Sequence, residues 1–288
     1  MLFHPSFVLT YFLRQPSSYP QLPRETPYCA DNGQDSTALA IYLRDRVPEM
    51  EYVFCDTEKE LPETYEYLER IEAYLGKPIV RLKHDGRGFD HHLIVRHGFL
   101  PSPLNRWCTQ ELKLKPFERY VGNDRVFSYV GIRADEDRQG YISHKSNITA
   151  VFPFKEAGIV KQDVINILEA SGLGFPKYYR WRSRSGCFFC FFQQKIEWIG
   201  LLENHPDLFE AARRYEELSR QTKYRYTWAE RESLNELSRS DRAAAIKDEY
   251  ARRLAVEQAK RPNKLLVDVL GDLVEEDSED RACLICEL

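Results

Sequence analysis

The residues most suited to chemistry are two cysteines separated by two positions, Cys187 and Cys190, in a segment rich in phenylalanine. Thiolates at this spacing can reach one metal ion or cluster, and aromatic neighbours would exclude water and oxidants. The same pair also suits a redox dithiol or two buried thiols, and the spacing alone leaves all three open. A second pair with this spacing, Cys283 and Cys286, lies in an acidic C-terminal segment.

A polar segment offers a different chemistry, the binding of an anion. It consists of Asn32, Gly33, Gln34, Asp35 and Ser36. It follows an expected strand and precedes an expected helix, whose first N–H groups have no partner within the helix. These groups and the helix dipole both favour a phosphate at this place. The segment alone is a weak signal, because such turns are common.

Strands that alternate with helices must position these residues. We expect strands near 28–30, 51–55, 78–82, 126–132 and 150–154, and helices from 37 to 43 and from about 62 to 75. This order predicts an α/β fold, a doubly wound and mainly parallel sheet that binds ligands at the carboxyl ends of its strands. We expect an irregular arm over 1–27, the nucleotide-binding domain with the cysteine motif over 28–194, and a helical C-terminal extension over 195–288.

The composition is that of an ordinary enzyme of 288 residues, with 43% hydrophobic and 30% charged residues and a net charge of −4. This charge argues against a surface built for tight nonspecific binding of nucleic acid. No apolar stretch is long enough to span a membrane, and no secretion signal is recognised. Seven cysteines without such a signal favour thiols or metal ligands over disulfides. We therefore expect a cytoplasmic protein, with Cys29 and Cys55 as buried thiols of core strands.

Over roughly residues 27–215 the sequence resembles the PAPS-reductase-like branch of the PP-loop superfamily, whose loop typically reads Ser-Gly-Gly-Lys-Asp-Ser. The matches occur in the family's order: Asp31–Ser36 with Thr37-Ala38-Leu39, Asp56-Thr57, Glu63-Thr64, Cys108-Thr109, Leu112-Lys113, Pro116, Gly131-Ile132-Arg133, Pro153-Phe154, Asp163-Val164, Gly172-Leu173, Pro176 and Gly186–Cys190. The resemblance implies the HUP-like fold of the adenine nucleotide alpha hydrolases.

The loop departs from the family pattern at three positions. Asp31 replaces serine, Asn32 replaces the first glycine, and Gln34 replaces lysine. Loss of the lysine removes a charge-assisted contact with phosphate, worth about 1.5–3 kcal/mol. Asp31 adds repulsion unless a divalent cation such as Mg²⁺ lies between it and the phosphates.

The resemblance also implies which residues act. Asn32, Gly33, Gln34, Asp35 and Ser36 would hold the phosphates of ATP. Asp56 and Thr57 would lie near the ribose or adenine, and Gly131 would allow close approach of the ligand. The residues expected to be catalytic are Asp35, Ser36 and Arg133. A strand-end turn at Asp56-Thr57, and an ion pair of Arg133 with Asp135 or Glu136, are the structural alternatives.

For the metal, the resemblance implies Cys108 as a third ligand beside Cys187 and Cys190. The fourth ligand would be Cys286 or Cys283, or an iron atom would stay open. A [4Fe–4S] cluster is the expected cofactor, with Zn²⁺ as the alternative and a site without metal as a third possibility.

The resemblance implies an ATP pyrophosphatase that adenylates an acceptor for sulfur transfer via the Fe–S cluster, with Mg²⁺ bound to ATP and a cysteine desulfurase as sulfur donor. The fold and its cysteines are similar to the DNA phosphorothioation proteins, which would make DNA the acceptor, together with other proteins of the modification system. A PAPS or APS (sulfonucleotide) reductase is the second hypothesis. A non-catalytic nucleotide-binding subunit with a degenerate PP-loop is the third.

Overall fold

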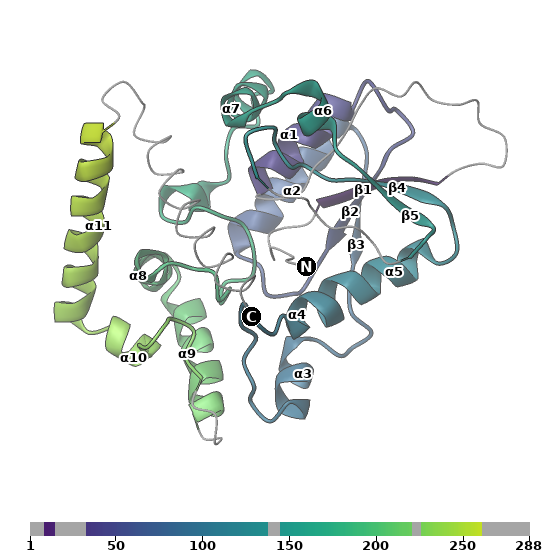
Figure 1. The fold of residues 1–288 in the computed structure, drawn as a ribbon. Coiled ribbons are helices and arrows are strands. Elements are labelled where there is room, and N and C mark those ends of the chain that lie inside the picture. Colours follow the sequence, from purple (N-terminus) through teal and green to yellow (C-terminus); the bar gives the residue numbers. More distant parts are fainter. Residues whose placement is uncertain (1–8, 15–32, 138–144, 221–225, 261–288) are drawn as a thin grey trace. The chain divides into compact units, whose positions relative to one another are not determined.

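The computed structural model describes residues 9–14, 33–137, 145–220 and 226–260 (Figure 1). The chain divides into two compact units, each of which is formed from separate stretches of the sequence. The first takes residues from Met1–Gly86, Thr109–Lys177 and Arg184–Gly186, and the second from Arg87–Cys108, Tyr178–Ser183 and Cys187–Leu288. Two short helical elements, α4 (Trp107–Thr109) and η2 (Lys177–Arg180), lie where the chain passes between the units.

The first unit contains a five-stranded sheet in the order β3-β2-β1-β4-β5. The strands are β1 (Leu9–Arg14), β2 (Glu51–Cys55), β3 (Ile79–Leu82), β4 (Val126–Tyr129) and β5 (Ile148–Val151). β2 pairs with β3, and β4 with β5, in parallel, whereas β1 is antiparallel to both β2 and β4. Since β2 and β4 both oppose β1, they run in the same direction, and their carboxyl ends lie at the same edge of the sheet.

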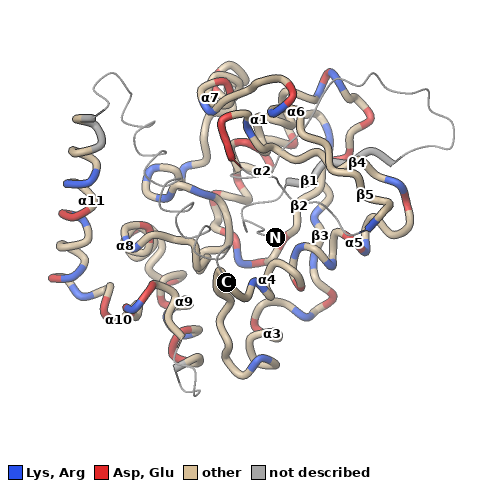
Figure 2. Tube along the Cα trace, viewed as in Figure 1, with Lys and Arg blue, Asp and Glu red and all other residues tan. Residues whose placement is uncertain are grey.

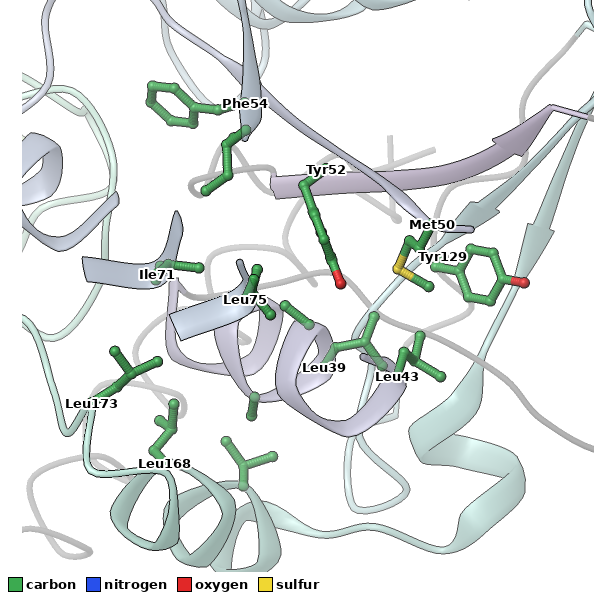
Figure 3. Close-up of a cluster of buried hydrophobic side chains, with 14 of the residues drawn as sticks. Leu39, Leu43, Met50, Tyr52, Phe54, Ile71, Leu75, Tyr129, Leu168 and Leu173 are labelled. Carbon is green, nitrogen blue, oxygen red and sulfur yellow. The ribbon is translucent and has the colours of Figure 1, made fainter. Parts of the chain in front are cut away.

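Helices cover both faces of this sheet (Figure 1). On one face lie α1 (Gly33–Leu43), α2 (Pro62–Leu75), α6 (Pro153–Ala157) and α7 (Lys161–Ala170). Figure 3 shows the core beneath them, where Leu39 of α1, Ile71 of α2 and Leu168 of α7 pack with Tyr52 and Phe54 of β2. The helices α2 and α6 each begin with a proline, whose fixed φ suits the first helical turn.

On the other face lies α5 (Lys115–Val121), which follows a π-helical turn η1 (Gln110–Leu114). Phe117 and Val121 of α5 pack there against Val53 and Cys55 of β2. Successive residues of β2 therefore enter opposite cores, as the alternation of side chains in a strand requires. The unit is a doubly wound α/β domain, which confirms the expected fold class.

The second unit is helical in its described residues. It contains α3 (Phe89–Val95), α8 (Lys195–Asn204), α9 (Pro206–Arg220), α10 (Leu234–Leu237) and α11 (Ser240–Lys260). Acidic and basic residues are interspersed along α11 (Figure 2). The expected helical character of the C-terminal region is confirmed for these residues.

Two expectations about the elements need correction. We expected an irregular arm over residues 1–27, but Leu9–Arg14 forms the central strand β1. Thr10, Tyr11 and Phe12 are β-branched and aromatic types that suit a strand, and the antiparallel pairing makes the sheet less uniformly parallel than expected. The expected fifth strand over 150–154 instead ends at Val151, because Pro153 begins α6. The expected strand near 28–30 lies outside the described residues.

Candidate functional site

The helix α1 begins at the polar loop, and its first turn is mostly buried. Gly33 is its first residue, and the side chains of Asp35, Ser36 and Thr37 are buried. The N–H of Gly33 donates a hydrogen bond to Oγ of Ser185 (3.0 Å), and the Thr37 hydroxyl donates to the Gly33 carbonyl (2.6 Å). Gln34, where the family pattern has lysine, is partly exposed. Asn32 and Asp31 lie outside the described residues.

Arg133 lies in the segment that follows β4, and a buried ion pair joins it to the first turn of α1. Its Nη1 lies 3.0 Å from Oδ2 of Asp35, and both side chains are 1% exposed. The same guanidinium contacts Asp135 through Nε at 3.0 Å and Glu136 through Nη1 at 2.8 Å. One positive charge thus faces three carboxylates, and the ion pair named as the structural alternative is present. Arg133 holds Asp35 in this arrangement, and its expected catalytic role stays a prediction.

Asp56 and Thr57 follow β2 at the same sheet edge. Oδ1 of Asp56 accepts hydrogen bonds from the N–H of Glu58 (2.8 Å) and the hydroxyl of Tyr65 (2.9 Å). The Thr57 hydroxyl donates to Oε1 of Glu60 (2.8 Å). These hydrogen bonds form the strand-end turn, and both side chains are buried. The role of Asp56 and Thr57 in nucleotide binding stays a prediction. Gly131 is also buried, beyond the end of β4.

Cys55, the last residue of β2, is a core thiol as expected. Its Sγ donates to the carbonyl of Lys113 (3.5 Å), and burial raises its pKa to about 12. We predict that iodoacetamide leaves Cys55 unmodified in the folded protein and alkylates it in urea, because the thiol is both protonated at neutral pH and inaccessible. Mass spectrometry of peptides checks this, with the more exposed Cys108 and Cys187 as internal references. Modification of Cys55 at the rate of these two in the native protein would contradict the burial.

The C-x-x-C motif forms a turn in the second unit. The N–H of Cys190 donates to the carbonyl of Cys187 (3.0 Å), which also accepts from Nη2 of the buried Arg182 (2.9 Å). Nε2 of Gln193 donates to the carbonyls of Phe188 (2.8 Å) and Cys190 (3.3 Å). Cys190 is buried and Cys187 is partly exposed. The turn is therefore held by side-chain donors on both sides.

An aromatic cluster of the second unit surrounds this turn. Phe189 stacks on Trp228 with ring centroids 5.3 Å apart, and its ring lies 4.1 Å from that of Phe89. Trp107, next to Cys108, stacks on Phe89 at 5.0 Å. The expected apolar shell around the motif is present, and it also includes residues from α3 and from the segment that precedes α10.

The expected metal centre is not preformed in the part of the chain that the structure describes. There, no group of three or more Cys, His, Asp or Glu side chains is arranged to hold a metal ion. Cys108, Cys187 and Cys190 are thiols, all belonging to the second unit, but they do not make a three-thiolate site. Cys286 and Cys283 lie outside the described residues. The expected [4Fe–4S] cluster and its alternative Zn²⁺ both stay predictions.

Comparison with known proteins gives a family match for part of the chain. Residues 27–155 match the family of the phosphoadenosine phosphosulfate reductase domain. The match covers less than half of the chain. The matched range holds the loop, Asp56, Cys108 and Arg133, but ends before the C-x-x-C motif. The match supports the sequence resemblance over these residues.

Two uncharacterized proteins of Methanocaldococcus jannaschii are similar to this chain. One is 26% identical over 208 residues, which cover 67% of this chain and 42% of the relative. The other is 24% identical over 188 residues, which cover 62% of this chain and 44% of the relative. The chain spans less than half the length of these relatives. No solved structure matches it significantly. Among the described residues, no helix is long and apolar enough to cross a membrane.

The structure also shows residues with structural roles that the sequence did not indicate. Gln193 and Ser185 make the contacts given above, and Glu197 of α8 accepts hydrogen bonds from the N–H (2.7 Å) and hydroxyl (2.5 Å) of Ser183. The residues of each contact do not belong to one sequence motif, so the sequence alone does not reveal these contacts. The position of Ser185 directly before Gly186-Cys187 was the one available signal.

Proposed function

We propose that this chain binds ATP by its phosphates at the N-terminus of α1 and activates an acceptor oxygen for sulfur transfer, with release of pyrophosphate. The observation that carries the proposal is the first turn of α1, buried within the stretch that matches the reductase domain and joined to the segment after β4 by the Arg133–Asp35 pair. N–H groups at a helix start bind phosphate oxygens without any cationic side chain. This suits a loop that lacks the family's lysine.

The proposed reaction has two steps. The acceptor oxygen attacks the α-phosphorus of ATP, the bond to the β-phosphate oxygen breaks, and pyrophosphate leaves. The acceptor then carries AMP on that oxygen, and a sulfur nucleophile displaces AMP. The N–H groups of α1 stabilise the negative charge that develops on the phosphates. Asp35, held by Arg133, keeps the first turn in its conformation for this step.

The charges near α1 favour Mg²⁺ as a companion of ATP. The cluster of Arg133 with Asp35, Asp135 and Glu136 holds three carboxylates against one guanidinium. An ATP phosphate chain beside this cluster meets net repulsion unless a divalent cation is bound to it, as Mg²⁺ usually is through phosphate oxygens. When bound, Mg²⁺ would supply charge neutralisation on the phosphates.

The sulfur donor that we propose is a cysteine desulfurase, and the acceptor that we propose is DNA. The charge of −4 means that DNA would be bound through a local surface or a partner protein. The family description supports a second candidate, a sulfonucleotide reductase. Pyrophosphate release from ATP distinguishes the first function, and sulfite release from PAPS or APS the second. Binding of ATP without either product would indicate a non-catalytic subunit.

Substitution of Gln34 tests the phosphate site by a gain of affinity. Gln34→Lys restores the family's lysine at a partly exposed position in the first turn of α1. We expect ATP with Mg²⁺ to bind this variant about 10 to 100 times more tightly than the parent, because a charge-assisted hydrogen bond is worth about 1.5–3 kcal/mol. Isothermal titration calorimetry measures both affinities.

Asn123→Lys is the control, because it adds the same charge at an exposed turn before β4, at the opposite end of that strand from Arg133. It should bind ATP like the parent. Equal gains in both variants would show a nonspecific charge effect. If neither the parent nor Gln34→Lys binds ATP, with or without Mg²⁺, the proposed nucleotide site is wrong.

A further inference from the structure

The hydroxyl of Ser185 occupies the acceptor position that a phosphate oxygen would take at the N–H of Gly33. Its hydroxyl accepts a hydrogen bond from the N–H of Gly33 at 3.0 Å, between residues that are 152 positions apart, and Ser185 is 1% exposed. Gly33 is the first residue of α1, so its N–H is one of those without a partner inside the helix. The serine hydroxyl therefore satisfies a donor of the loop that we propose for the phosphates of ATP.

The chain directly after Ser185 leads into the C-x-x-C motif. The stretch Arg184–Gly186 belongs to the first unit, and the stretch that begins at Cys187 belongs to the second. At this passage Gly186 has a φ of 140°, a value that residues with a side chain rarely adopt. A residue of this kind allows the backbone on its two sides to reorient, as hinge residues do. Ser185 thus fixes the residue before Gly186, and Cys187 directly follows that glycine.

We infer that Ser185 is a positioning residue that couples the nucleotide loop to the cysteine motif. A phosphate oxygen is a stronger acceptor than a hydroxyl, so ATP displaces Ser185 from the N–H of Gly33. The release of Ser185 removes one restraint on the segment that precedes Gly186, and the start of the Cys187–Cys190 turn changes its dynamics. This inference rests on the proposed function, because it takes a nucleotide phosphate to be the ligand of the Gly33 N–H. The contact itself is present without any nucleotide and can be tested alone.

The chain offers a matched control two residues away. The hydroxyl of Ser183 bonds to Glu197 of α8 and not to α1. Ser183→Ala therefore removes a hydroxyl from the same segment without changing the bond to Gly33. Ser185→Ala removes that bond and leaves the N–H of Gly33 available to a phosphate.

Hydrogen–deuterium exchange on the full chain tests the contact without nucleotide. In Ser185→Ala we expect exchange to increase at least about fivefold at Gly33 and in the segment that covers 184–190, because one hydrogen bond contributes about 1 kcal/mol. In Ser183→Ala, Gly33 should exchange as in the parent protein. Unchanged exchange at Gly33 in Ser185→Ala would overturn the inference, whatever happens with ATP.

Addition of ATP with Mg²⁺ tests the coupling. In the parent protein, ATP should slow exchange at residues 33–37 and speed exchange at 184–190. In Ser185→Ala, ATP should bind about fivefold more tightly and should leave the exchange rate of 184–190 unchanged. ATP that protects 33–37 but has no effect on 184–190 in the parent would refute the coupling and keep the proposed function. Absence of protection at 33–37 in both proteins would refute the nucleotide step of both proposals.

Discussion

Arg133→Met should lower the free energy of unfolding by about 3–5 kcal/mol, because it leaves the Asp35 carboxylate buried without its counter-charge. Both side chains of the pair are 1% exposed, so water cannot take over the lost interaction. Methionine keeps most of the volume of the arginine stem and limits the effect to charge and hydrogen bonding. Urea denaturation followed by circular dichroism measures the change.

A second arginine provides the control for Arg133. Arg239 contacts Asp241 at 2.8 Å, but both side chains are 66% exposed, and an exposed pair contributes about 0–1 kcal/mol. Arg239→Met should therefore unfold close to the parent midpoint. The double variant Asp35→Asn/Arg133→Met should regain part of the loss, because no charge stays unpaired between these positions. Equal losses for Arg133→Met and Arg239→Met would contradict the buried pair.

Gly200→Ala should destabilise the second unit by about 1–3 kcal/mol, the usual effect of overpacking a core. Gly200 lies within α8, where alanine normally stabilises a helix by about 1 kcal/mol relative to glycine. Here a Cβ at position 200 would lie 2.7 Å from Cε3 and 3.1 Å from the carbonyl oxygen of Trp181. The predicted sign is thus the reverse of helix propensity, because the side chain and the backbone of Trp181 would both have to move.

Thermal unfolding of Gly200→Ala checks this prediction, with Glu203→Ala as the reference. Glu203 is an exposed residue of the same helix and pairs only with Lys247 at the surface, so its replacement should change the stability by less than about 1 kcal/mol. Trp181→Ala combined with Gly200→Ala should be less destabilised than the sum of the two single variants, since the close contact with the ring is gone. A stabilised Gly200→Ala would show that Trp181 does not pack on α8.

Local signals predicted the regular elements well. The helix expected from about Pro62 to Leu75 has these bounds in the structure, and the strand Glu51–Cys55 is also confirmed. A proline at the helix start, a glycine with a φ of 65° at its end, and a short apolar run are all features of neighbouring residues. Leu9–Arg14 was missed as a strand because its partners β2 and β4 lie far along the chain.

The sequence by itself determined the α/β class, the similarity of residues 27–155 to the reductase domain, and the order of the motifs, because periodicity and short motifs are written in adjacent positions. Only the tertiary structure decided which of these residues meet. Asp35 and Arg133 are 98 positions apart, and Gly33 and Ser185 are 152 apart. Sequence spacing pairs Arg133 with its neighbours Asp135 and Glu136, whereas the pairing with Asp35 exists because folding of the sheet brings α1 to the segment after β4. For Cys108, Cys187 and Cys190, the family resemblance suggested one metal site, and no such group is arranged among the described residues.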